Sequence, residues 1–256
     1  MKTAKIATWN VNSVKARQER LLAWLGRHAP DVLCLQELKT EAAGFPLSAV
    51  QEAGYRAVLH GQKTYNGVAI LAREEPQEVE VGFGDGGDES QARLIAATVG
   101  DLRVASVYVP NGQTVGSEKW VYKLDWLRRL AAWVERQPAA PLVVCGDLNI
   151  APESRDAANP ESWADSVLCH PDARAAFARL LAAGLVDAFR LLRPEDGLYS
   201  WWDYRQLGFP RNDGLRIDHV LVASALATRC TAAAIDRDER KGKLPSDHAP
   251  VIVELG

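Results

Sequence analysis

The segment that most constrains the fold is an apolar run over residues 142–145, which passes through Gly146 into Asp147 and Asn149. A short apolar run of this kind is typical of a strand buried on both faces. Because strand side chains alternate between the faces of a sheet, we expect Asp147 and Asn149 to point the same way. Two polar groups aimed in one direction at a strand end are suited to holding a metal ion or a water molecule.

Comparable apolar runs recur along the chain and predict a strand-rich protein. Besides the run at 142, strands are predicted over residues 5–9, 31–36, 55–60, 67–73, 93–99, 102–109, 217–222, 229–235 and 250–255. Gly100 and Asp101 separate two of them and indicate a two-residue hairpin. Part of the sheet structure is therefore expected to be antiparallel.

Helices are predicted between these strands from apolar residues at helical spacing. Ser13 and Ser117 are each expected to cap a helix that begins at the next residue, and Gly184 is expected to end a helix over residues 172–183. Strands interleaved with helices, with no break in composition, predict an α/β fold in which two packed mixed sheets are covered by outer helices. We expect residues 1–256 to form one domain.

The overall charge and the cysteines restrict the classes of function. The net charge is −3, so binding of a polyanion such as DNA requires a local basic patch or a bound cation. Cys34 and Cys145 lie within apolar runs, which favours buried thiols over disulfides or metal ligands. The first residues lack the apolar stretch of a secretory signal, and no run is long enough for a membrane helix. A reducing, cytoplasmic compartment is therefore expected.

Polar residues follow or interrupt apolar segments at six places along the chain. They are Asn10, Glu37, Tyr108 with Asn111, Asp147 with Asn149, Asp218, and Asp247 with His248. Any one of them alone is typical of a turn, but six in one domain indicate a shared site.

These residue types support a definite chemistry. Glu37 and an aspartate, together with amide oxygens, form an all-oxygen site suited to Mg²⁺ or Mn²⁺. An aspartate paired with a histidine holds the imidazolium charged and oriented, and a free carboxylate can take a proton from water. Asn and Tyr side chains can donate to the charge that develops on a phosphoryl oxygen. Together these groups predict metal-assisted hydrolysis of a phosphate ester.

The segments that carry these residues also resemble a known family. They are residues 9–12 (Trp-Asn-Val-Asn), 35–37 (Leu-Gln-Glu), 108–111 (Tyr-Val-Pro-Asn), 146–149 (Gly-Asp-Leu-Asn), 215–218 (Leu-Arg-Ile-Asp) and 246–250 (Ser-Asp-His-Ala-Pro). In this order they resemble the exonuclease III family of DNA-repair nucleases, within the endonuclease/exonuclease/phosphatase superfamily. Residues 122–127 and 202–205 are similar to its bacterial branch.

The resemblance implies a four-layer α/β sandwich and a Mg²⁺-dependent phosphodiesterase, with Mn²⁺ as a possible substitute. The implied activity is incision 5′ to abasic sites, 3′-to-5′ exonuclease action, or both, by a monomer on duplex DNA with abasic or 3′-blocked lesions. The implied catalytic residues are Tyr108, Asp147, Asn149, Asp218 and His248, and the implied metal-binding residues are Asn10, Glu37, Asp147, Asn149, Asp247 and His248. Whether Asp147 is the base or mainly a metal ligand, and whether one or two metals bind, stays open.

Further residues are predicted to contact the substrate. By the resemblance, Asn111 lies near the scissile phosphate and Trp201 lines the pocket for a base-free sugar. Arg205 and Arg216 flank a glycine-rich loop and are predicted to belong to a phosphate-binding rim. His219 neighbours Asp218 on a strand, so it should face the opposite side and have a structural role.

Two other functions compete with the nuclease. A phosphohydrolase of the same superfamily that acts on inositol phosphates or phospholipid head groups would share the fold and metal site. The segments at 202–205 and 214–218 resemble the nuclease branch and argue against it. A non-catalytic DNA-binding module is disfavoured by the net charge of −3 and by the full set of candidate catalytic residues.

Overall fold

The computed structural model describes residues 3–137 and 141–256, and its centre consists of two six-stranded sheets. The first sheet has the order β11-β12-β1-β2-β4-β3 and the second β5-β6-β7-β8-β10-β9. The strands of the first sheet are β1 (Ala4–Asn10), β2 (Val32–Gln36), β3 (Arg56–His60), β4 (Val68–Ala72), β11 (Cys230–Ile235) and β12 (Val251–Leu255). Those of the second are β5 (Gln77–Val81), β6 (Leu94–Val99), β7 (Leu102–Tyr108), β8 (Leu142–Asp147), β9 (Leu185–Asp187) and β10 (Asp218–Ala223).

Each sheet is built around one parallel pair of strands. β1 pairs with β2 and β7 with β8 in parallel, whereas all other pairings are antiparallel. A crossover helix connects the members of each pair, as parallel strands require. The tight turn at Gly100 and Asp101 joins β6 to β7, which confirms the predicted hairpin. The repeated arrangement places the carboxyl ends of all four parallel strands in corresponding positions.

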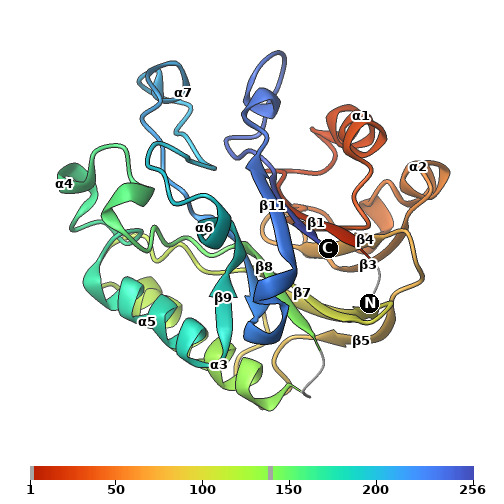
Figure 1. The fold of residues 1–256 in the computed structure, drawn as a ribbon, viewed down its shortest axis with the longest axis horizontal. Coiled ribbons are helices and arrows are strands. Elements are labelled where there is room, and N and C mark those ends of the chain that lie inside the picture. The colour runs from red at the N-terminus through yellow and green to blue at the C-terminus, as the bar shows by residue number, and fades with distance from the viewer. Residues whose placement is uncertain (1–2, 138–140) are drawn as a thin grey trace.

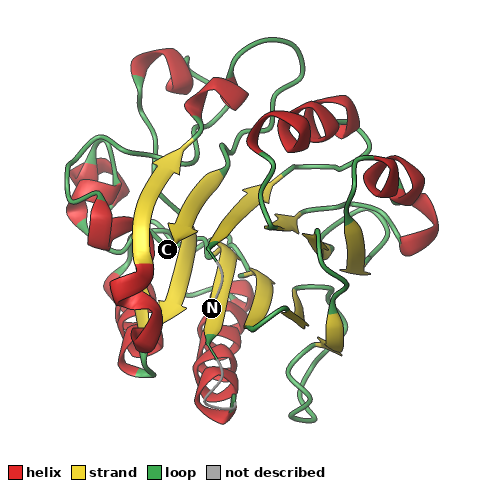
Figure 2. Ribbon diagram, turned by 45° about the vertical axis from the view of Figure 1, so that its right-hand side comes forward, coloured by secondary structure: helices red, strands yellow, loops and turns green. Residues whose placement is uncertain are grey.

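The helices are α1 (Gln18–His28), α2 (Leu47–Glu52), α3 (Glu118–Arg136), α4 (Pro160–Trp163), α5 (Pro171–Ala182), α6 (Ala188–Leu192) and α7 (Gly208–Arg211), with short 3₁₀ turns at Ala42–Gly44, Ser154–Asp156, Ser224–Arg229 and Arg237–Arg240. Helices α1 and α2 cover the outer face of the first sheet, and α3 and α5 cover that of the second (Figures 1 and 2). Helix α6 instead packs against β10 and β11 and contributes to the apolar core between the sheets. Of the helices in the described part of the chain, none combines the length and apolar character needed to cross a membrane.

Three apolar cores account for the layered arrangement. One lies between the sheets and includes Cys34 from β2 and Cys145 from β8, so both cysteines are buried as predicted. A second joins α1 and α2 to the first sheet, with Trp24 at its centre. A third joins α3 and α5 to the second sheet around Leu130. Helix, sheet, sheet and helix thus form four layers, and the predicted α/β sandwich is confirmed.

Local signals were correct for one helix cap and wrong for another. The Ser117 hydroxyl accepts a hydrogen bond from the backbone N–H of Trp120, so it caps α3 as predicted. Ser13 does not cap α1, which begins at Gln18. Its own φ is +89°, and its N–H donates to the Glu37 carbonyl at 2.8 Å. The backbone at Ser13 is therefore held by the segment after β2 rather than by a helix.

Other local predictions were refined. The aromatic pair Trp201 and Trp202, whose alternation suits a short strand, contains only isolated bridges, in which Trp201 pairs with Leu215 and His248. The segment after Gly184 contains the short strand β9 and the helix α6. Trp202 is fully buried, while Trp201 is half-buried and its indole N–H donates to Asp247, in the segment before β12.

Candidate active site

The candidate site lies where the carboxyl ends of the two parallel pairs meet. Asn10 ends β1 and Glu37 directly follows β2, both in the first sheet. Tyr108 and Asp147 end β7 and β8 in the second sheet, where they are register partners. His248 comes from the segment just before β12. Residues far apart in the sequence therefore converge, as their positions at strand ends predict.

Asn10 connects the two sheets at this point. Its fully buried amide donates to Glu37 Oε1 at 2.8 Å and to Asp147 Oδ2 at 3.0 Å. The Tyr108 hydroxyl donates to the same Glu37 oxygen at 3.0 Å. Two donors thus orient the Glu37 carboxylate, and one of them also fixes Asp147.

Glu37, Asp147 and His248 form a group that could hold a metal ion. Each offers one ligand atom, and these atoms all lie within 4.8 Å of one another. The group combines carboxylate oxygens with an imidazole nitrogen, a donor set compatible with a divalent cation. Lys39 Nζ lies 2.9 Å from Glu37 Oε2 and balances part of the negative charge.

His248 is held in a charged and oriented form. Its Nδ1 lies 2.8 Å from Asp218 Oδ2, and its Nε2 faces Asp147 Oδ2 at 3.7 Å. Burial alone would lower the pKa of His248, but the charges of Asp218 and Asp147 outweigh it and raise the pKa to about 10. The same Asp218 oxygen accepts from the Ser200 hydroxyl at 2.6 Å. This support residue gave no signal in the sequence.

The pKa of Asp147 is also raised, but for a carboxyl group this favours the neutral form. Burial raises its pKa to about 7, although the His248 charge works against the rise. A carboxylate with a pKa near neutrality can accept a proton in its charged form and release it again. We call Glu37, Asp147, Asp218 and His248 the site cluster.

Asn149 reaches the site by a route that the alternation of a strand did not predict. β8 ends at Asp147, and Asn149 has a left-handed φ of +52°. Its N–H donates to Asp147 Oδ1 at 2.9 Å, and its side-chain amide bonds Val109 O and Asn111. A turn, not a continuing strand, therefore places the Asn149 amide beside Asn111.

The remaining predicted metal ligand, Asp247, is held by other side chains. Its two carboxylate oxygens accept from Asn12 Nδ2 at 2.9 Å and from Trp201 Nε1 at 3.0 Å. Trp163 packs edge-on against Trp201 with ring centroids 6.0 Å apart. Roles for Asp247 in metal binding and for Trp201 in substrate binding stay predictions.

The prediction that Arg216 contacts substrate is wrong. Arg216 is 1% exposed and pairs with Asp156 at 2.7 Å and Asp187 at 2.8 Å, so its guanidinium is inaccessible to DNA. Arg190 shares Asp156 with it, and Arg216 Nη1 lies 2.9 Å from His219 Nδ1. We call these five residues the arginine cluster. Arg205, in contrast, is exposed and stays a candidate for the rim.

Two further lysines contact the site and were not predicted from the sequence. Lys39 lies beside Glu37, and Lys123 of α3 is fully buried, with its amine bonded to the carbonyl of Asn149. Burial lowers the pKa of Lys123 to about 7, opposed mainly by the charge of Asp147. The helical pattern of α3 places Lys123 on its buried face, but a buried lysine cannot be told from a surface one by spacing alone.

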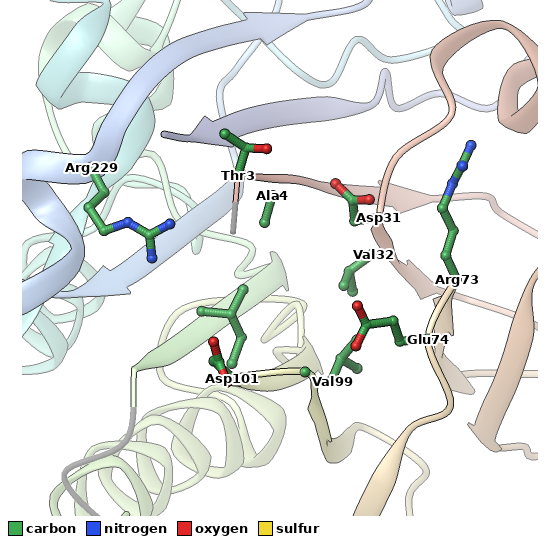
Figure 3. Close-up of a pocket in the computed structure, with 11 residues that line it drawn as sticks. Thr3, Ala4, Asp31, Val32, Arg73, Glu74, Val99, Asp101 and Arg229 are labelled. Carbon is green, nitrogen blue, oxygen red and sulfur yellow. The ribbon is translucent and has the colours of Figure 1, made fainter. Parts of the chain in front are cut away.

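A cavity of about 370 Å³ lies at the opposite end of the sheets (Figure 3). Its lining includes Asp31 before β2, Arg73 after β4 and Asp101 in the β6–β7 turn. Glu37 and Asp147 are at the other ends of β2 and β8. This cavity is therefore separate from the candidate site.

The chain is similar to known proteins over nearly its full length. Residues 7–248 match the model of the endonuclease/exonuclease/phosphatase family. Exodeoxyribonuclease III from Haemophilus influenzae is 37% identical over 98% of this chain and 99% of that protein. An AP endonuclease structure from Archaeoglobus fulgidus superposes with a TM-score of 0.95 at 39% identity, covering 98% of both chains. The 3′ phosphatase NExo from Neisseria, bound to a product DNA hairpin, gives 0.95 at 43% identity over 99% of both chains.

Proposed function

The chain belongs to the endonuclease/exonuclease/phosphatase family, and from this we propose that it is a DNA-repair nuclease that hydrolyses phosphodiester bonds in duplex DNA. The observation that carries the proposal is the convergence of Glu37, Asp147 and His248 within one 4.8 Å group. Its near full-length similarity to exodeoxyribonuclease III supports DNA as the substrate. The activities we propose are incision 5′ to abasic sites and removal of 3′-terminal nucleotides or blocks, by a cytoplasmic, single-domain monomer.

The site fits a divalent metal ion, which we propose to be Mg²⁺, with Mn²⁺ as a substitute. Glu37 is the principal ligand, since two donors already orient its carboxylate, and Asn10, Asp147, Asn149 and Asp247 are the candidate neighbours. His248, also implied as a ligand by the resemblance, is not counted among them, because both ring nitrogens of its imidazolium carry protons. When bound, the ion neutralises charge on the phosphate and polarises it toward attack. Metal binding would require Lys39 to yield the Glu37 oxygen that it contacts at 2.9 Å.

The side chains divide the proton transfers between them. Asp147, with a pKa near 7, takes the proton from the attacking water. The His248 imidazolium, fixed at Nδ1 by Asp218, directs Nε2 toward the phosphoryl oxygen and stabilises its developing charge. The amides of Asn111 and Asn149 each keep one N–H free of the hydrogen bond described above and supply further donors around the phosphate. Tyr108 acts indirectly, because its one O–H donates to Glu37.

The test is incubation of the protein with Mg²⁺ and three duplexes, one with a single abasic site, one nicked and one blunt. We expect incision 5′ to the abasic site, digestion from 3′ ends, or both, and no cleavage in EDTA. Cleavage of inositol phosphates with all three duplexes left intact would overturn the proposal. The relative rates on the three duplexes define the main activity.

A further inference from the structure

Lys123 is a buried lysine whose amine makes three hydrogen bonds within the protein. Its Nζ donates to three backbone carbonyls, those of Asn111 at 3.1 Å, Asn149 at 2.7 Å and Val167 at 2.6 Å. The side chain has no exposed surface. An ammonium group has three N–H donors, so three carbonyls match it completely.

The three carbonyls belong to three separate segments of the chain. Asn111 follows β7, Asn149 follows β8, and Val167 precedes α5. The side chains of the first two also meet, since Asn111 Nδ2 donates to Asn149 Oδ1 at 3.1 Å. Lys123 therefore holds the backbones of two site residues whose side chains touch each other.

The need to fill this space does not explain why the residue is a lysine. Burying an ammonium is unfavourable unless it is well bonded, and a methionine would occupy a similar volume without that cost. What the lysine supplies is a single point from which three segments are held at fixed separations. One of these segments is the turn directly after β8, where Asn149 has a left-handed φ of +52°.

We propose that Lys123 is a positioning residue for the nuclease: it fixes the backbones of Asn111 and Asn149 so that their amides face the scissile phosphate. Lys123 itself does not touch the substrate. The kinetic part of this inference rests on the proposed function, whereas its structural part is measurable without any substrate.

The structural test is hydrogen–deuterium exchange of Lys123→Met. The matched control is Leu180→Ala, which removes a fully buried side chain of α5 from the same apolar core as α3. Urea concentrations are chosen so that the two variants and the wild type have the same global free energy of unfolding. Under these conditions we expect the amide exchange rates of residues 148–151 to be about tenfold higher than in the wild type for Lys123→Met, and unchanged for Leu180→Ala. Equal exchange in the two variants would overturn the inference, whichever substrate the protein cleaves.

The kinetic test is a double-mutant cycle on the abasic duplex. Lys123→Met should lower kcat by about 10- to 100-fold with KM changed less than about threefold, because displacement of catalytic groups affects mainly the transition state. In the Asn149→Ala background, the same change should cost less than about twofold, since its effect acts through Asn149. Independent, multiplicative losses would contradict the inference. If the wild-type protein is inactive on every duplex, the proposed function is refuted. The hydrogen–deuterium exchange experiment then still tests whether Lys123 fixes the backbone at Asn149.

Discussion

Two buried charge clusters lie next to each other, and the adjacent residues Asp218 and His219 send one side chain into each. The site cluster contains three carboxylates and one histidine. The arginine cluster contains two carboxylates, two arginines and a histidine. The first keeps an excess of negative charge, whereas the second is neutralised within itself.

The excess charge has a measurable consequence for the carboxyl groups. Burial opposes ionisation in both clusters, but Arg216 and Arg190 overcome it and keep the pKa of Asp156 below its usual value. Asp147 lacks an arginine partner among its hydrogen bonds, and its pKa rises to about 7. A buried carboxylate such as Asp147, whose charge is partly uncompensated, is suited to proton transfer, whereas one that is fully paired, such as Asp156, is suited to a structural role.

The largest expected effect separates activity from stability. Asp147→Asn should slow cleavage of the abasic duplex by about 10³-fold, or about 4 kcal/mol in the barrier, because the base is lost. The free energy of unfolding should stay the same or increase, since an uncharged amide replaces a carboxyl whose ionisation is unfavourable there. Single-turnover rates and urea titrations measure the two effects. Near-normal cleavage would contradict the assignment of Asp147.

Disruption of the arginine cluster should have the reverse outcome. Arg216→Met leaves two buried carboxylates short of a partner and should cost about 3–5 kcal/mol in the free energy of unfolding. Under conditions where the variant is folded, kcat should fall by less than about tenfold. A stable but inactive Arg216→Met variant would place Arg216 in catalysis and erase the distinction between the clusters.

The two clusters should also lose their stabilising effect on the fold at opposite ends of the pH range. The pKa of His248 is raised from 6.5 to about 10. Its stabilisation is complete below pH 6.5 and lost as the pH rises toward 10. The lowered pKa values of Asp156 and Asp187 give stabilisation above about pH 4 that is lost as the pH falls.

Urea midpoints measured in EDTA from pH 3 to 10 would detect both losses. In a plot of urea midpoint against pH, we expect His248→Gln to remove the decline at alkaline pH alone. We expect Arg216→Met to remove the decline at acidic pH alone. The loss of both declines in one variant would show that the clusters titrate as one unit.

The smallest expected effect distinguishes the exposed arginine from the buried one. Arg205 is exposed and paired with Asp203, so Arg205→Ala should reduce the slope of log Kd against log salt by about 1 for duplex DNA. Arg216→Met should leave this slope unchanged. Fluorescence anisotropy of a labelled abasic duplex in EDTA measures it, and equal slopes for wild type and Arg205→Ala would remove Arg205 from the rim.

The sequence predicted those parts of the fold and site that depend on local pattern. Ten of the twelve strands were placed within one or two residues, because their period and apolar content are local properties. No bounds were predicted for β5 or β9, which are an exposed strand and a strand of three residues. Glu37 and Asp147 were found because they terminate such strands. The resemblance of the six segments to a nuclease family added the partnership of Asp218 with His248, which local pattern does not contain.

The wrong predictions for Arg216 and Asn149 have a common physical cause: the residues that each of them contacts are distant along the chain. Arg216 was assigned to the surface because its acidic partners, Asp156 and Asp187, are 60 and 29 residues away. Asn149 was assigned to a strand because its turn is stabilised by Lys123, which lies on a separate helix. Such contacts form only in the folded molecule and leave no periodic signal.

The order in which the chain contributes to the site has a consequence for its synthesis. Asn10 and Glu37 are made early, Asp147 follows more than a hundred residues later, and His248 comes from the segment before the last strand. Ribosomal synthesis proceeds from the N-terminus, so a nascent chain lacks its imidazole until residue 248 has been added. The candidate site is therefore incomplete until the last strand is about to be made.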